Sequence, residues 1–161
     1  MKAKIFLSSR LQRLLDDTIR ELAMQGRFYE EKEAMQHGST TIYRHSVHVA
    51  YVSLFLMEKW QFPMDEVSLV KGALLHDYFL YDWHEKDGGH RLHGFRHPAF
   101  ALYNASKDFS LNRKERNIIA RHMFPLTVLP PRCLEAWIVC FVDKYCAFSE
   151  TMGDGRIQWE R

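Results

Sequence analysis

Apolar residues recur every three or four positions along most of this chain, and this spacing favours an all-α fold. The pattern is clearest in residues 6–24, where it comprises Leu7, Leu11, Leu14, Leu15, Ile19 and Leu22. Such a stripe is typical of a helix that buries one face. No run of the sequence has the period-2 alternation of a half-buried strand. With 161 residues, the chain is long enough for one domain with a core. We therefore expect a single-domain helical bundle of about six to seven helices.

Capping residues, prolines and glycines mark the expected ends of the helices. Residues 38–41 break the chain and offer N-cap residues for a helix that runs to about Trp60. Pro98 suits the first turn of a helix, and Asn112 with Glu115 resembles a capping box. The other expected helices cover residues 6–24, 27–36 (short and exposed), 65–77, 98–106, 112–122 and 131–149. Residues 78–96 lack any period and contain two adjacent glycines, which predicts a long loop of the kind that is functional or mobile.

Composition argues against several classes of partner. The formal net charge of +2 is too small for a nucleic-acid-binding footprint. The N-terminus lacks the apolar run of a signal peptide, and no stretch is long and apolar enough to span a membrane. The three cysteines, Cys133, Cys140 and Cys146, form no CxxC pair, and their odd number argues against a disulfide framework. We expect a soluble, cytoplasmic protein with buried thiols and with no nucleic-acid or membrane partner.

Four polar residues lie on faces that the apolar pattern predicts to be buried. His76 and Asp77 end an apolar helix, His45 lies in an apolar stripe, and Asp143 follows seven apolar residues. Buried imidazoles and carboxylates need partners. Taken alone, His45 could be satisfied by one hydrogen bond, and Asp143 by a salt bridge to Lys144 or to a distant arginine. Together, two imidazoles and two carboxylates form a mixed nitrogen and oxygen site that suits a divalent metal ion.

Two further histidines extend this constellation. His122 follows Ile118 by one turn on an apolar stripe, and His97 precedes Pro98 at an expected N-cap. Either could be structural by itself, but a bridging Asp77 would allow the six residues to hold two ions about 3.5–4 Å apart. The other helical histidine, His48, falls on the opposite side of its helix and is expected at the surface. The histidines of the expected loop, His84, His90 and His93, are interpreted as solvated residues, with metal or substrate contact as the alternatives.

Three segments in this order resemble the HD superfamily of metal-dependent phosphohydrolases, in particular its small bacterial hydrolases: Tyr43–Ala50 around the first histidine, Gly72–Asp77 with the doublet, and Phe141–Lys144 around the last aspartate. Arg96-His97-Pro98 and Ala120-Arg121-His122 resemble the two further histidines of the binuclear subset. The chain lacks the Gly-Tyr-Pro motif of the cyclic-dinucleotide phosphodiesterases and the usual lysine after the doublet. These departures argue against a cyclic-dinucleotide substrate.

The resemblance covers about residues 40–150 and implies an organisation of the chain. We expect residues 1–38 to form N-terminal helices that pack on the core, 39–150 to form the HD metal-binding domain, and 151–161 to form a C-terminal tail. The implied fold is the helical bundle of the HD-domain type.

The implied chemistry is hydrolysis of a phosphate ester or anhydride, with a nucleotide as the expected small substrate. The first ion would be held by His45, His76, Asp77 and Asp143, and the second by Asp77, His97 and His122. Such ions lower the pKa of a bound water and neutralise charge on phosphoryl oxygens. The ligand set suits one or two ions of Fe, Mn, Co or Zn, and Mg less well because it prefers oxygen ligands.

Other roles are assigned to charged residues near the ligands. Asp77 is interpreted as catalytic through the metal, and Asp82 as a general acid or base. The cations next to the ligands, Arg96, Arg121 and Lys144, are interpreted as phosphate contacts, and ordinary surface charge is the alternative reading.

Two functions compete with the phosphohydrolase. The same six ligands would serve a di-iron oxygenase, which oxygen consumption and a mixed-valent iron signal would reveal. A non-catalytic ligand-binding domain on the same scaffold is the other alternative, and the complete ligand set argues against it. The leucine stripe of residues 6–24 either covers the core or pairs with a second copy in a homodimer.

Overall fold

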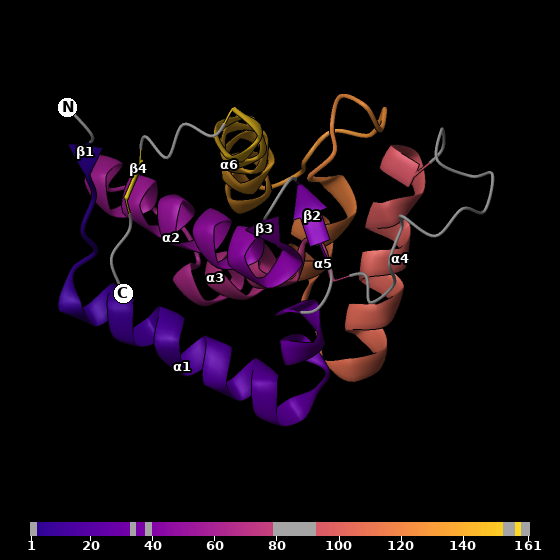
Figure 1. Ribbon diagram of the computed structural model, residues 1–161, viewed down its shortest axis with the longest axis horizontal. Coiled ribbons are helices and arrows are strands. Elements are labelled where there is room, and N and C mark those ends of the chain that lie inside the picture. Colours follow the sequence, from indigo (N-terminus) through magenta and orange to yellow (C-terminus); the bar gives the residue numbers. More distant parts are fainter. Residues whose placement is uncertain (1–2, 33–34, 38–39, 79–92, 153–156, 159–161) are drawn as a thin grey trace.

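The computed structural model describes residues 3–32, 35–37, 40–78, 93–152 and 157–158. Within these ranges the chain forms six α-helices, which confirms the predicted all-α class (Figure 1). The helices are α1 Ser9–Gln25, α2 Ile42–Trp60, α3 Glu66–Leu75, α4 His93–Asp108, α5 Arg113–Arg121 and α6 Leu134–Thr151. A 3₁₀ helix, η1 Phe28–Lys32, and four short strands, β1 Ala3–Lys4, β2 Met35–His37, β3 Thr40–Thr41 and β4 Ile157–Gln158, complete the described elements. The strands form two small ladders, β1 with β4 in parallel and β2 with β3 antiparallel.

Helix α2 is the centre of the bundle. It packs against α3 and α6, while α5 packs against α3, α4 and α6 (Figure 1). Most side chains of α2 from Ile42 to Met57 are buried, because this helix is apolar on nearly every face. Thr41 caps its N-terminus by accepting a 3.2 Å hydrogen bond from the backbone N–H of Arg44. Histidines in this helix therefore lie inside the protein wherever they fall along it.

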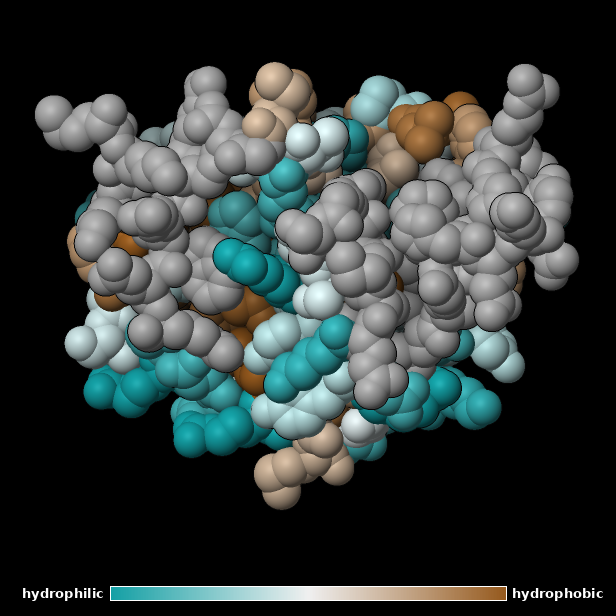
Figure 2. Space-filling model, in the orientation of Figure 1, coloured by the Kyte–Doolittle hydropathy of each residue, from teal (hydrophilic) through white to brown (hydrophobic). Residues whose placement is uncertain are grey.

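Helix α1 covers one side of the central helices (Figure 1). The buried residues of its predicted stripe join the main core: Leu11, Leu15, Ile19 and Leu22. Its other face carries polar side chains, and the part of the surface over α1 is mainly hydrophilic in Figure 2. The helix is therefore amphipathic, and its apolar stripe is covered by the core of the same chain.

Helices α3 and α5 approach each other closely at Gly72. A β-carbon on this residue would lie 3.0 Å from Cβ and 3.1 Å from Cγ2 of Ile118. This close packing fixes the end of α3, where His76 and Asp77 follow, against α5.

We expect Gly72→Ala to lower the free energy of unfolding by about 1–3 kcal/mol, because the added methyl overpacks a closed interface. Urea denaturation of the two proteins measures the difference. Ile118→Val removes the Cδ1 atom nearest to the added methyl, so the double variant should lose less stability than the two single changes added together. An unchanged or raised stability in Gly72→Ala would contradict this view of the interface.

Several predicted boundaries were wrong. Helix α4 begins at His93, five residues before the expected start, so Pro98 lies inside the helix and His97 is not its N-cap. The absence of an N–H on proline costs α4 one backbone hydrogen bond, which the packing of the helix outweighs. Residues 27–36 do not form the expected exposed helix: Phe28–Lys32 form η1, in which Phe28 is fully buried, and Met35–His37 form β2. Helix α6 begins at Leu134, after the two prolines.

The last helix carries the cysteines, as the sequence indicated. Cys140 and Cys146 are buried free thiols, and Cys133 at the N-cap of α6 is partly buried. In the described part of the chain, no helix combines the length and the apolar character needed to cross a bilayer.

Candidate metal centre

Five elements bring six polar side chains together in the interior of the bundle. His45 comes from α2, His76 and Asp77 from the turn after α3, His97 from α4, His122 from the C-cap of α5 and Asp143 from α6. All six are buried, and the most exposed of them, His97 and Asp143, are 7% exposed. Such groups are costly to bury unless they are paired or bind a metal. Their atoms form two groups that could each hold an ion, and Asp77 belongs to both.

The first group contains His45, His76, Asp77 and Asp143. Oδ1 of Asp143 lies 3.0 Å from Nε2 of His45 and 3.4 Å from Nε2 of His76. Oδ2 of Asp77 lies 3.4 Å from Nε2 of His76 and 3.9 Å from Nε2 of His45. Two nitrogens and two carboxylate oxygens therefore converge on one small volume.

The second group contains Asp77, His97 and His122. The Nε2 atoms of His97 and His122 are 2.8 Å apart, and they lie 3.1 and 3.2 Å from Oδ1 of Asp77. Ligands that each lie about 2.0–2.1 Å from one ion at right angles are about 3 Å from one another. The spacing of these three atoms therefore fits a shared metal ion.

The two oxygens of Asp77 face different groups. Oδ2 faces His45 and His76, whereas Oδ1 faces His97 and His122. A carboxylate in this orientation can contribute one oxygen to each of two neighbouring ions.

Backbone carbonyls fix the ring orientation of two histidines. Nδ1 of His76 donates to the carbonyl of Ala73 at 2.7 Å, and Nδ1 of His122 donates to that of Ile119 at 2.8 Å. Since Nδ1 carries the hydrogen, Nε2 of a neutral ring presents a lone pair to the centre. In the described part of the chain, the buried Nε2 of His76 has no hydrogen-bond partner. A metal ion would satisfy this atom, so the donor set fits the metal that the sequence predicted.

A further carboxylate, Glu150, orients the first histidine. Its Oε2 accepts from Nδ1 of His45 at 2.8 Å, and its Oε1 accepts from Nδ1 of His48 at 3.0 Å. The expectation that His48 lies at the surface was wrong, because it is 6% exposed on a helix that is buried on nearly all sides. Sequence reasoning missed Glu150, although it follows Asp143 by seven residues and thus shares its face of α6.

Electrostatics in the centre couple the histidines to the carboxylates. Burial alone would lower the pKa of His45, but its hydrogen bonds with Asp143 and Glu150 outweigh burial and raise the pKa to about 9. Burial opposes the charge of Asp77, yet the charge of His76 and hydrogen bonds from His122 and His97 hold the pKa of Asp77 well below its usual range. The carboxylates thus stabilise positive charge at this point, which a divalent ion also supplies.

Burial has the opposite net result at His122. There it outweighs the hydrogen bond with Asp77, so the pKa of His122 lies below its ordinary value. A neutral imidazole is the form that binds metals. The ring is therefore suited to act as a ligand at neutral pH.

The other predicted site residues lie in different places. Arg96 is exposed on α4, next to His97. Lys144 does not pair with Asp143, because its Nζ donates to the carbonyl of His122 at 2.7 Å and to that of Cys140 at 3.2 Å. Arg121 lines a surface pocket beside α5. The predicted acid or base Asp82 and the loop histidines His84 and His90 lie outside the described residues, and His93 is the first residue of α4.

Fold and centre together define an all-α domain built around a buried histidine and aspartate cluster that suits divalent metal ions. A family model for the HD domain matches residues 42–147. The chain belongs to the HD domain family, whose members are generally metal-dependent hydrolases. No curated protein and no solved structure matches the chain significantly.

Proposed function

We propose that the protein is a metal-dependent phosphohydrolase that cleaves a phosphate ester or anhydride of a small nucleotide. The family supplies the class of reaction. The observation that carries the proposal for this chain is the orientation of Asp77, whose two oxygens face two separate sets of histidines. A pair of ions bridged by one carboxylate suits phosphoryl chemistry, which develops charge on several oxygens at once.

The residues of the centre would hold the ions in two groups. His45, His76, Asp77 and Asp143 suit the first ion, and Asp77, His97 and His122 suit the second. When bound, divalent ions supply Lewis acidity, which polarises phosphoryl oxygens and lowers the pKa of water. Nitrogen with carboxylate donors favours Fe, Mn, Co or Zn over Mg.

The protein contributes orientation to this chemistry. Glu150 and the carbonyls of Ala73 and Ile119 fix three imidazole rings through Nδ1, so that their Nε2 atoms face the centre. Lys144 ties α6 to the carbonyl of His122 and thereby holds the end of α5. Rings fixed in this way pay little further entropy when they bind an ion or when charge develops on the substrate.

Contacts with the substrate are a separate part of the proposal. Arg96 and Lys144 lie beside ligands of the centre in the sequence and carry the positive charge that a phosphate requires. The third predicted cation, Arg121, lines the surface pocket beside α5 and is therefore not proposed as a contact of this substrate. Asp82 is the proposed general acid or base.

We expect phosphate release from nucleotides only while metal is bound. Purified protein is analysed for its elements, treated with a chelator, and assayed on nucleoside mono-, di- and triphosphates and on a simple aryl phosphate before and after the metal is restored. Chelation should abolish release, and restoring the original metal should recover it, because the ions supply the Lewis acidity.

The same samples test the other reading of the centre. Oxygen consumption in the iron-loaded protein, without release of phosphate from any substrate of the panel, would overturn the proposal in favour of an oxygenase. Metal-loaded protein that binds nucleotides but cleaves none of them would also overturn it.

A further inference from the structure

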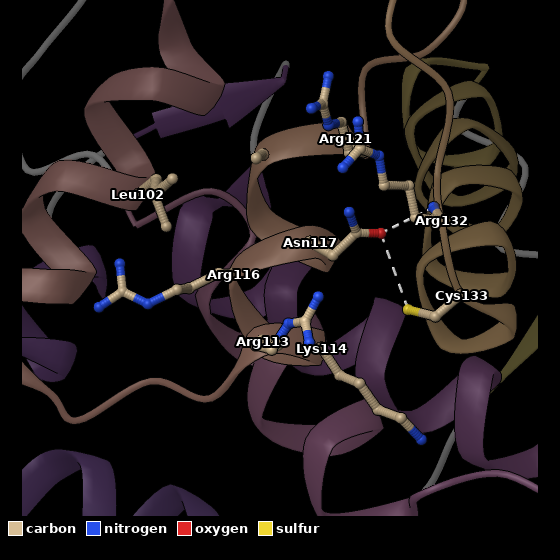
Figure 3. A pocket seen from close by; sticks show the side chains of 9 residues that line it. Leu102, Arg113, Lys114, Arg116, Asn117, Arg121, Arg132 and Cys133 are labelled. Carbon is tan, nitrogen blue, oxygen red and sulfur yellow. Dashed lines mark hydrogen bonds between the residues drawn. The ribbon is translucent and has the colours of Figure 1, made fainter.

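A pocket of about 580 Å³ lies on the surface beside α5 (Figure 3). Its walls come from α5, from Leu102 of α4 and from residues 132–133, which precede α6. This volume falls in the range of sites for small molecules. None of the six metal-centre side chains lines the pocket.

The pocket and the metal centre lie on opposite faces of α5. Successive residues of a helix are about 100° apart, so Arg113, Asn117 and Ala120 lie on one side and His122 on the other. The burial pattern agrees, since Glu115, Ile118 and Ile119 on the His122 side are buried. One helix, about 10 Å across with its side chains, thus separates the two sites. A ligand in the pocket would not reach the ions directly.

Positive charge dominates the lining of the pocket. It contains the side chains of Arg113, Lys114, Arg116, Arg121 and Arg132. Lys114 is paired with Glu135 at 2.7 Å, and Arg116 donates to two neutral oxygens, those of Leu111 and Ser106.

The other three arginines of the pocket lack a carboxylate partner in the described part of the chain. Among the described residues, no carboxylate forms an ion pair with Arg113, Arg121 or Arg132. The buried Nε of Arg121 likewise has no hydrogen-bond partner in the described part of the chain. Guanidinium groups that line one pocket without counter-charges repel one another, and an oxyanion would relieve this repulsion.

Neutral groups complete the pocket. Asn117 lies below Arg121 and beside Arg132 in Figure 3, and its Oδ1 accepts from the backbone N–H of Arg132 at 2.9 Å. This bond leaves the amide N–H₂ of Asn117 as a donor. Leu102 and Ala120 add apolar surface at the side of α4. The lining therefore combines charged donors for phosphate groups with an apolar area for a flat or aliphatic portion.

We propose that this pocket is a second anion-binding site, which takes a small molecule that carries a di- or triphosphate group. Its guanidinium groups bind the phosphate oxygens, and the three unpaired arginines match the several negative charges of such a chain of phosphates. The site does not depend on which reaction the metal centre performs, because it shares no side chain with that centre.

Calorimetric titration of the full chain with inorganic tripolyphosphate tests the proposal. The double variant Arg113→Gln and Arg132→Gln removes two unpaired guanidinium groups and should bind at least about tenfold more weakly, since charge-assisted hydrogen bonds are lost. The matched control, Arg13→Gln and Arg20→Gln on α1, changes the net charge by the same amount and should bind like the unaltered protein. The metal content is measured before and after titration, so that extraction of metal by the probe is detected.

Two further measurements identify the class of ligand and the residues that bind it. Nucleoside di- and triphosphates that bind more tightly than tripolyphosphate would indicate that the apolar area also contributes. Backbone amide shifts in the unaltered protein should change in residues 113–121 and 132–133, a readout that does not depend on how the variants fold. The proposal is overturned if tripolyphosphate does not bind at millimolar concentration, or if the Arg113 and Arg132 double variant binds it normally. It is also overturned if both double variants lose binding equally, or if a single-stranded oligonucleotide binds more tightly than tripolyphosphate.

Discussion

Replacing Asp77 with asparagine is expected to remove both metal ions at once. The substitution keeps the size and shape of the side chain but removes the negative charge that both groups of histidines face. Elemental analysis should find essentially no bound metal, and phosphohydrolase activity should fall by more than about 100-fold, because loss of even an outer hydrogen-bond partner costs about 10–100-fold. The metal-dependent rise in thermal stability, about 4 kcal/mol at a thousandfold excess over Kd, should disappear as well.

Variants of residues that belong to only one of the two groups test whether Asp77 bridges two ions or binds only one. His122→Ala removes a ligand of the second group only, so it should leave one ion in the group of His45 and Asp143. Asp17→Asn, a surface carboxylate of α1, is the matched control and should keep the full metal content. An Asp77→Asn protein that is folded by circular dichroism and retains two ions would show that Asp77 is not the bridge.

The burial of the candidate metal ligands was predictable because it follows from helical periodicity. His45, His122 and Asp143 fall on apolar faces in the sequence, and the structure buries each of them. The capping box of Asn112 and Glu115 likewise placed the start of α5 correctly, since both of its hydrogen bonds are local. Burial along a helix and the capping of its end depend on residues that are close in the sequence, so both could be predicted from it.

What escaped prediction depends on packing between distant segments. His48 was predicted at the surface because only one face of its helix was expected to be buried, whereas α2 packs against other helices on several sides. Glu150 lies one residue beyond the predicted end of the last helix, so its spacing from Asp143 did not enter the argument. The start of α4 was misjudged because proline usually marks a first turn, and Pro98 lies further inside.

Glu150 is expected to control the affinity of the first ion, although it is not a ligand itself. Its carboxylate bridges Nδ1 of His45 and Nδ1 of His48, and these hydrogen bonds outweigh burial to hold its pKa at about 2. It therefore stays charged at neutral pH, fixes the ring of His45 and makes Nε2 of that ring a stronger donor to metal.

Glu150→Ala should weaken binding of the first ion by about 10–100-fold, as is typical of outer partners of metal ligands. The ion of the His97 and His122 group should be unaffected, because the Nε2 atoms of these two rings face Oδ1 of Asp77, whereas Glu150 binds His45 and His48. Metal titration followed by calorimetry measures both affinities. The conservative Glu150→Gln should recover part of the loss, since an amide oxygen can still accept from His45.

Two further variants decide between orientation of the ring and general stability. Glu21→Ala removes an exposed carboxylate of α1 and should leave both affinities unchanged. His48→Ala removes the second partner of Glu150 but leaves its bond to His45, so it should weaken the first ion less than Glu150→Ala does. If Glu150→Ala lowered the melting temperature without changing either affinity, the carboxylate would only fasten α6 to α2. A selective loss of the first ion instead requires that Glu150 act through the imidazole of His45.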